Sequence, residues 1–259
     1  MKHLLLPFLS LVLTTALTSP LTAADAISAS ADQALRAMSA KLAGARQFSF
    51  HAKREIDAGL LEGVNLPEKA NIAVSVSRPN QLAAVSVSRK GTRRFIADGR
   101  KLTLLDGKMN HYAQIPMRTS LDGLVAALDE KYGFTPPLAE FALSNPYKDI
   151  RQQAHTITDL GVVKVGAGFL GLGGTQCHHL ALTGNVADAE LWIAVGDQLP
   201  RKLVATFKNL PGQPQLRITF SAWNLAAPVS AADFTFVPPP GAQKVEMWTT
   251  AKMQAASKN

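Results

Sequence analysis

NIAVSVSRPNQLAAVSVSR, residues 71–89, alternates apolar side chains with small or polar ones at a period of two. Ile72 and Val74 fall on one side of the chain, and the pattern repeats after Pro79-Asn80. Successive side chains of a strand point to opposite faces, so this stretch predicts two antiparallel strands joined by a turn at Pro79-Asn80. One face of their sheet should be buried, and the other should contact water.

The same period extends over residues 47–114 and returns after residue 154. Asp98-Gly99 and Asp106-Gly107 supply the residues that hairpin turns prefer. Further strands are expected within residues 155–165, 175–184, 189–195, 201–210 and 215–225, with a short one in 234–247. Strands and helices do not alternate at the spacing of parallel βαβ units, so the sheet should be antiparallel.

Three segments have a helical pattern instead. Ala31–Ala45 repeats apolar residues at spacings of three and four and has Gly44 near its end. Leu121–Tyr132 has the same periodicity before Gly133, and Leu138–Ile150 is expected to be another short helix. The predicted fold class is therefore α+β, with a single curved antiparallel sheet and helices packed on one face.

The N-terminus has the layout of a secretory signal peptide. Lys2 gives a positive start, and Leu4–Leu17 form an apolar run that is followed by small residues. The alternative, an uncleaved membrane anchor, is disfavoured by Pro7 and by the Thr- and Ser-rich second half. We expect a periplasmic protein with a signal peptide at residues 1–24, one domain at 25–250 and a disordered tail at 251–259.

The composition narrows the classes of partner. The 259 residues include 27 Lys and Arg against 19 Asp and Glu, a formal net charge of +8. This charge suits anionic lipid headgroups, although a basic surface that contacts only water is the simpler alternative. Nucleic acid is a poor partner for an exported chain whose basic residues do not interleave with aromatic ones. Cys177 is the single cysteine, so packing rather than an internal disulfide must stabilise the domain.

A glycine-rich stretch raises the question of a nucleotide site. Gly166, Gly168 and Gly171 have the G-x-G-x-x-G spacing, and Asp188 and Glu190 follow at about the distance of a ribose-binding acid. A dinucleotide fingerprint must lead into a helix whose N-terminus holds the pyrophosphate, and here an alternating strand follows. The stretch is interpreted as a connection between two strands, and no cofactor is expected.

Cys177, His178 and His179 are the residues that most resemble a chemical site. The two histidines should point to opposite faces of a strand, so they cannot hold one metal ion together. Cys177 and His179 share a face, which leaves a zinc site or a Cys–His nucleophile as alternatives, but no further ligand or third catalytic group is evident. The sequence contains no G-x-S-x-G, S-x-x-K or H-E-x-x-H motif. We therefore predict no catalytic or metal-binding residues and no enzyme activity.

An ordered series of segments carries a family resemblance. The segments are ALRAMSAKLAGARQFSF, SRPNQL, DGRKLTLLD, YAQIP, CHHLAL, LWI, LPRKLVATFK and FTFVPPPGAQKVE. The series covers about residues 30 to 247 and resembles a family of bacterial predicted periplasmic proteins that is classed as a domain of unknown function. RPNQL and DGRKLTLLD are also similar, more distantly, to segments of the LolA/LolB lipoprotein carriers. This similarity implies an unclosed antiparallel half-barrel with helices on its concave side, where such carriers hold acyl chains.

The concave face is the expected binding site. The residues expected to line it are Phe95, Leu102, Leu104, Tyr112, Trp192, Leu203, Phe207, Ile218 and Phe220. They could equally pack a dry core against the helices, because apolar residues at alternating spacing do not distinguish the two arrangements.

Three functions follow from these observations. The leading hypothesis is a periplasmic carrier of lipid or of acylated, lipoprotein-like ligands, without chemistry. The second is an envelope protein-interaction or sensor module that has a dry core and a protein partner. The third, an enzyme, would require Cys177, His179 and an acid to converge in the fold.

Overall fold

The structure is a computed structural model that describes residues 27–60, 66–134, 136, 138–166, 173–226 and 228–252. The expected signal peptide lies outside the described residues. The C-terminal residues are described as far as Lys252. Near that end, Thr250 Oγ1 donates a hydrogen bond to the Lys131 carbonyl oxygen at 3.2 Å. The described chain therefore extends slightly beyond the expected start of the tail.

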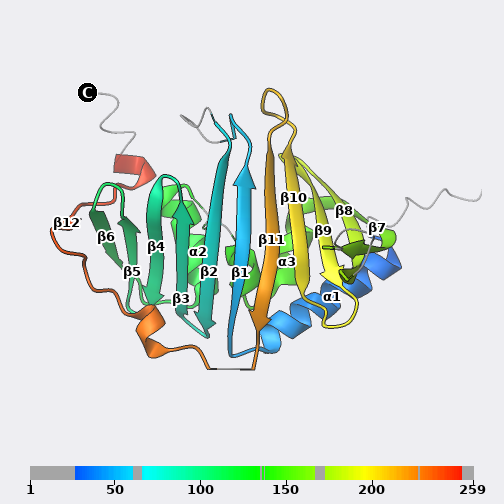
Figure 1. The fold of residues 1–259 in the computed structure, drawn as a ribbon, viewed down its shortest axis with the longest axis horizontal. Coiled ribbons are helices and arrows are strands. Elements are labelled where there is room, and N and C mark those ends of the chain that lie inside the picture. The colour runs from blue at the N-terminus through cyan, green and yellow to red at the C-terminus, as the bar shows by residue number, and fades with distance from the viewer. Residues whose placement is uncertain are drawn as a thin grey trace, which may run out of the picture.

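A single open sheet of twelve strands forms the molecule (Figure 1). The strands are β1 Gln47–Ile56, β2 Glu68–Ser77, β3 Gln81–Ser88, β4 Gly91–Asp98, β5 Lys101–Asp106, β6 His111–Pro116, β7 Ala154–Val165, β8 Thr175–Gly184, β9 Ala187–Ala194, β10 Pro200–Phe207, β11 Gln215–Asn224 and β12 Gln243–Lys244. Their order is β12-β6-β5-β4-β3-β2-β1-β11-β10-β9-β8-β7, and all pairings are antiparallel except the parallel one between β12 and β6. The predicted α+β class with one open, mainly antiparallel sheet is confirmed.

Helices cover one face of this sheet (Figure 1). They are α1 Ala29–Gly44, α2 Leu121–Tyr132, the 3-10 helix η1 Ala139–Ala142 and α3 Pro146–Gln153. The single helix expected over 138–150 is thus divided, because the Asn145 side chain accepts from Lys148 N and Pro146 begins a new helix. No helix within the described ranges is long and apolar enough to cross a membrane.

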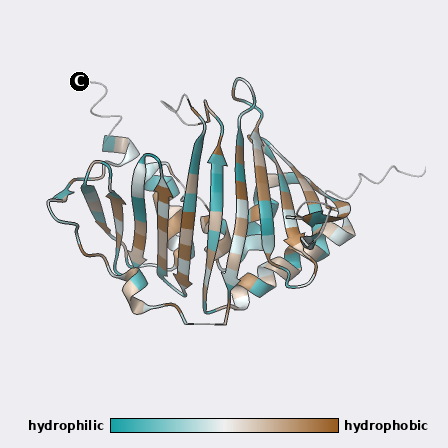
Figure 2. Cartoon of the chain, viewed as in Figure 1, coloured by the Kyte–Doolittle hydropathy of each residue, from teal (hydrophilic) through white to brown (hydrophobic). Residues whose placement is uncertain are grey.

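The helix-covered face, called the inner face here, carries the main hydrophobic core. Phe48 and Phe50 of β1 and Val74 and Val76 of β2 are buried there, while the residues between them point to the opposite, outer face. The hydropathy colouring in Figure 2 shows the resulting alternation along the central strands. At about 25 cal/mol per Å² of apolar surface removed from water, this contact between sheet and helices is the main stabilising term.

The C-terminal segment covers part of the outer face. Its 3-10 helix η3, Ala231–Phe234, places Phe234 against Ala83 and Ile96, whose neighbours along β3 and β4 face the inner core. Beyond η3 the chain reaches the edge of the sheet, where β12 pairs with β6. The outer face around Ala83 and Ile96 is therefore shielded from water by a segment that follows the last long strand.

Arg78 connects the helices to one end of the sheet. Its guanidinium donates to the carbonyl oxygens of Ala45 at 3.2 Å, Leu42 at 3.4 Å, Ala142 at 2.7 Å and Leu143 at 2.9 Å. These carbonyls belong to the C-terminal ends of α1 and η1, whose last carbonyl groups lack partners within the helix. One side chain from the β2–β3 turn thus satisfies the ends of two helical segments.

Candidate functional site

The inner face brings most of the expected lining residues together. The main core fully buries Leu102, Ile218 and Phe220. Three further side chains are partly buried and pack against this core, namely Phe95, Leu104 and Leu203. Phe207 lies at the end of β10 in the same alternation as Leu203 and is half-buried.

Trp192 and Tyr112 are placed differently, which corrects the expectation that they line the concave face. Trp192 is only 8% exposed, but it lies on the outer face, where the His179 ring stacks on it with centroids 4.3 Å apart and Lys202 Nζ lies 4.4 Å from its ring centroid. Tyr112 contacts Phe236 of the C-terminal segment, with ring centroids 5.2 Å apart. Both rings are covered by outer-face neighbours rather than by the inner core.

The inner face is closely filled. The cavity between α2 and the sheet has a volume of only about 10 Å³ and is lined by Leu82, Phe95, Leu121, Leu124, Val125, Pro136, Ala139 and Ala142. This volume is no more than the space of one water molecule, far below what an acyl chain occupies. A ligand could enter here only if the helices moved away from the sheet.

The backbones of α1 and α2 approach the sheet to different extents. Among the described residues α1 approaches β7, β8 and β9 closely, whereas α2 has few close backbone contacts with any strand. Leu121, Leu124 and Leu128 supply its buried face. Hydrogen bonds add to this packing. At the N-terminal end Leu121 N donates to Pro79 O at 2.9 Å and Ser144 Oγ donates to the carboxylate of Asp122 at 2.8 Å, and at the C-terminal end Thr250 Oγ1 donates to Lys131 O at 3.2 Å.

A charged cluster bounds the apolar inner face near the β1–β2 end. Arg54 donates to Glu68 at 2.7 Å, and Lys90 Nζ lies 2.9 Å from the same carboxylate. The side chains of Arg54 and Glu68 are only 13% and 8% exposed. Paired, these charges are tolerated in the interior, whereas removing one partner would leave a buried charge uncompensated.

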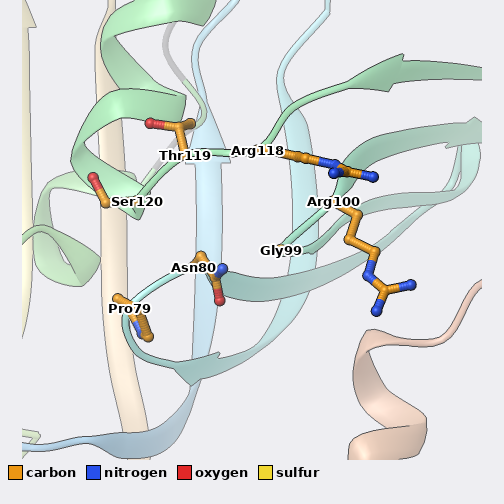
Figure 3. Close-up of a pocket in the computed structure, with 7 residues that line it drawn as sticks. All are labelled: Pro79, Asn80, Gly99, Arg100, Arg118, Thr119 and Ser120. Carbon is orange, nitrogen blue, oxygen red and sulfur yellow. The ribbon is translucent and has the colours of Figure 1, made fainter.

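A larger hollow lies at the opposite end of the sheet, outside the inner face (Figure 3). It has a volume of about 640 Å³ and is lined by Pro79, Asn80, Gly99, Arg100, Arg118, Thr119 and Ser120. These residues come from the β2–β3 turn, the β4–β5 turn and the link from β6 to α2. Sequence reasoning missed this hollow, because only the pairing of the strands brings the three segments together.

The Cys177–His179 pair does not form a nucleophilic site. Cys177 is fully buried, burial raises the pKa of its thiol, and its Sγ donates to the Thr175 carbonyl oxygen at 3.4 Å. His179 Nε2 bonds to the Glu190 carboxylate at 2.5 Å, and Trp192 covers its ring. A nucleophilic cysteine needs an accessible thiolate, and this arrangement provides neither access nor a lowered pKa.

The histidines lie on opposite faces, as predicted. His178 bonds to Asp159 at 3.0 Å on the inner side, while His179 faces outward. No group of three or more metal-binding side chains occurs within the described ranges. The glycine-rich stretch lies between the antiparallel pair β7 and β8, and β8 begins at Thr175, directly after Gly174; residues 167–172 lie outside the description. Neither arrangement supports a metal or nucleotide site.

Burial of Cys177 leads to a reactivity prediction. We expect its thiol to react with a disulfide reagent such as DTNB at least about a hundredfold more slowly in the folded protein than in guanidinium chloride, because reaction requires local opening. Val195→Cys in a Cys177→Ala background is the accessible control, since Val195 is 45% exposed. Equal rates for folded and unfolded protein would contradict the buried placement.

Comparison with known proteins addresses family and fold. The model of a family described as "Predicted periplasmic protein (DUF2092)" matches residues 31–248. A search of curated proteins finds no significant match. Among solved structures, an uncharacterized conserved protein from Thermus thermophilus has a TM-score of 0.50 and 12% identity, covering 84% of this chain and 99% of that one.

Two further solved structures resemble the chain. LprF from Mycobacterium bovis has a TM-score of 0.44 and 13% identity, with coverage of 78% of this chain and 99% of that one. A LolA superfamily protein, NE2245 from Nitrosomonas europaea, has a TM-score of 0.38 and 12% identity, with coverage of 80% and 97%. At these identities the likeness concerns the fold alone.

Proposed function

Since the chain belongs to the family of predicted periplasmic proteins described as DUF2092, we propose that it is a periplasmic binding protein that carries lipid or acylated ligands between its sheet and α2. The expectation of a periplasmic location is confirmed by this family. The observation that carries the proposal is the continuous apolar inner face, which is covered by separate helical segments instead of a second sheet.

The half of the inner face near α2 offers the binding surface. Phe95, Leu104, Ile115 and Met117 are only partly buried there, although they pack against the main core. An acyl chain that took the place of α2 would pack against these four side chains. It would keep out of water the apolar surface that α2 otherwise covers. Tyr112 and Trp192 are not part of this proposed surface, because they face outward.

Binding would require α2 to move. The hydrogen bonds at the ends of α2 and its three buried leucines would be exchanged for contacts with the ligand. A ligand shifts such an equilibrium only by the difference in its affinity for the two states, so long apolar ligands should bind better than short ones.

The carrier proposal is tested by what the protein retains. Expressed with its export signal and purified from the periplasm, the protein should yield a stoichiometric lipid or acyl peptide on extraction and mass spectrometry. Val125→Asp places a carboxylate on the cavity-lining side of α2 and should lower the retained lipid at least about tenfold, because burying a charge against an acyl chain is costly. The matched control is Val87→Asp, since Val87 is 49% exposed on β3.

The second candidate, a protein-interaction or sensor module, is favoured by the closely filled inner face with its cavity of about 10 Å³. It predicts protein free of lipid that also fails to bind a fluorescent fatty acid such as dansyl-labelled undecanoic acid. Lipid-free protein that gains the fluorescent ligand would instead support a carrier that had lost its cargo.

A further inference from the structure

Two arginines lie side by side at the end of the sheet that carries Arg78. Met117 N donates to the Arg100 carbonyl oxygen at 2.8 Å, which fixes the segment before Arg118 alongside the β4–β5 turn. Figure 3 shows the Arg100 and Arg118 side chains extending to the same side of the hollow. Both are exposed, and neither forms an ion pair with any described residue. Neighbouring like charges without an acid repel each other, so an anion between them would be stabilising.

The rest of the hollow adds hydrogen-bonding groups and no carboxylate. The Asn80 amide and the Thr119 hydroxyl line it, and neither side chain makes a hydrogen bond within the described part of the chain. Ser120 Oγ already accepts from Gly123 N, so the start of α2 is capped from within. The side chains of Arg100, Arg118, Asn80 and Thr119 therefore supply hydrogen-bond donors to the hollow.

The surroundings extend the positive charge. Arg46 precedes β1 and Lys101 begins β5, at the same end of the antiparallel sheet, and both are exposed without an ion pair to a described residue. The nearest acid in sequence, Asp98, accepts from the backbone N–H groups of Arg100 at 2.8 Å and Lys101 at 2.9 Å. The opposite end differs, because its Arg54, Lys90 and Glu68 neutralise one another in part.

We propose that this basic end, defined by Arg100 and Arg118 at the hollow and by Arg46 and Lys101 at the same end of the sheet, docks onto membrane surfaces rich in anionic phospholipid headgroups. Guanidinium groups bind phosphate oxygens in a forked geometry, and a pair of them suits a phosphodiester. The spread of cations across several strand ends matches a plane of headgroups better than one small ion. This docking is independent of the inner face and does not require the protein to carry lipid.

Vesicle flotation tests the proposal on the full protein purified from the periplasm. We expect binding to phosphatidylcholine vesicles that contain phosphatidylglycerol, and none to phosphatidylcholine alone. Arg100→Gln combined with Arg118→Gln should weaken that binding roughly thirtyfold, since each basic residue near an anionic surface contributes about a factor of five. The same variant should retain any lipid held at the inner face.

The matched control removes the same charge elsewhere. Arg89 and Arg94 are exposed, outside the hollow, and without an ion pair to a described residue, so their double Gln variant should bind nearly as the natural protein does. Equal loss in the two variants would overturn the proposal in favour of an effect of net charge alone. Displacement by inorganic phosphate, but not by chloride at equal ionic strength, would overturn it in favour of a site for a small anion.

Discussion

Replacing Arg78 with methionine is expected to lower the free energy of unfolding by about 3–5 kcal/mol, because four backbone carbonyls would lose a charged donor. Methionine keeps much of the side-chain volume, so the loss reports on hydrogen bonding rather than packing. For a domain of this size the melting temperature should fall by roughly 10 °C. Denaturant unfolding followed by circular dichroism measures the free energy, and a thermal scan measures the melting temperature.

Two further variants define the cause. Arg78→Lys retains the charge but cannot direct donors to four separate carbonyls, so it should fall between the natural protein and the methionine variant. Arg89→Met removes an exposed arginine and should change stability by less than about 0.5 kcal/mol. A loss below about 1 kcal/mol for Arg78→Met would show that water satisfies the helix ends as well as the guanidinium does.

Phe50→Ala should be comparably damaging, at about 3–5 kcal/mol. Phe50 is 1% exposed, and its ring centroid lies 4.3 Å from Trp223, 5.8 Å from Phe220 and 6.4 Å from Phe48. Its removal takes one ring out of an aromatic cluster at the centre of the inner face and leaves a cavity. The near-ultraviolet circular dichroism signal should weaken together with the midpoint of denaturation.

Phe50→Leu, which leaves a smaller cavity, should cost less than half as much. Val87→Ala, on an exposed position of β3, should change stability by less than about 0.5 kcal/mol. If Phe50→Ala bound small apolar probes such as benzene while losing little stability, the inner face would be less tightly packed than the contacts of Phe50 indicate.

Alternation in the sequence was sufficient for the fold but not for the assignment of every face. Leu121–Tyr132 was correctly predicted because Ser120 and Gly133 act as caps, and Gly133 adopts φ +66°. Trp192 was assigned to the wrong face because its neighbours Leu191 and Ile193 are also apolar, so the strand gives no alternation to read. Its burial depends on His179 and Lys202, which reach it only through strand pairing.

The remaining gaps concern contacts between residues far apart in the sequence. Tyr112 was expected in the concave face, but its ring contacts Phe236 on the outer face. The position of Phe236 depends on the path of the C-terminal segment, which is far from Tyr112 in the sequence. The hollow beside Arg100 and Arg118 was missed for a similar reason, since neither turn contains a recognisable motif. Such sites arise from the register of the sheet, which local patterns do not determine.

The pairing of β1 with β11 has a consequence for how the protein is made. Lys53 lies opposite Thr219, so the first long strand cannot complete its hydrogen bonding until nearly the last one has emerged from the export machinery. Contacts between such distant residues slow folding to the range of milliseconds to seconds. During that interval two incomplete sheets would expose the edges of β1 and β11 to other chains. Assembly of this protein in the cell should therefore depend on protection of those edges until both halves meet.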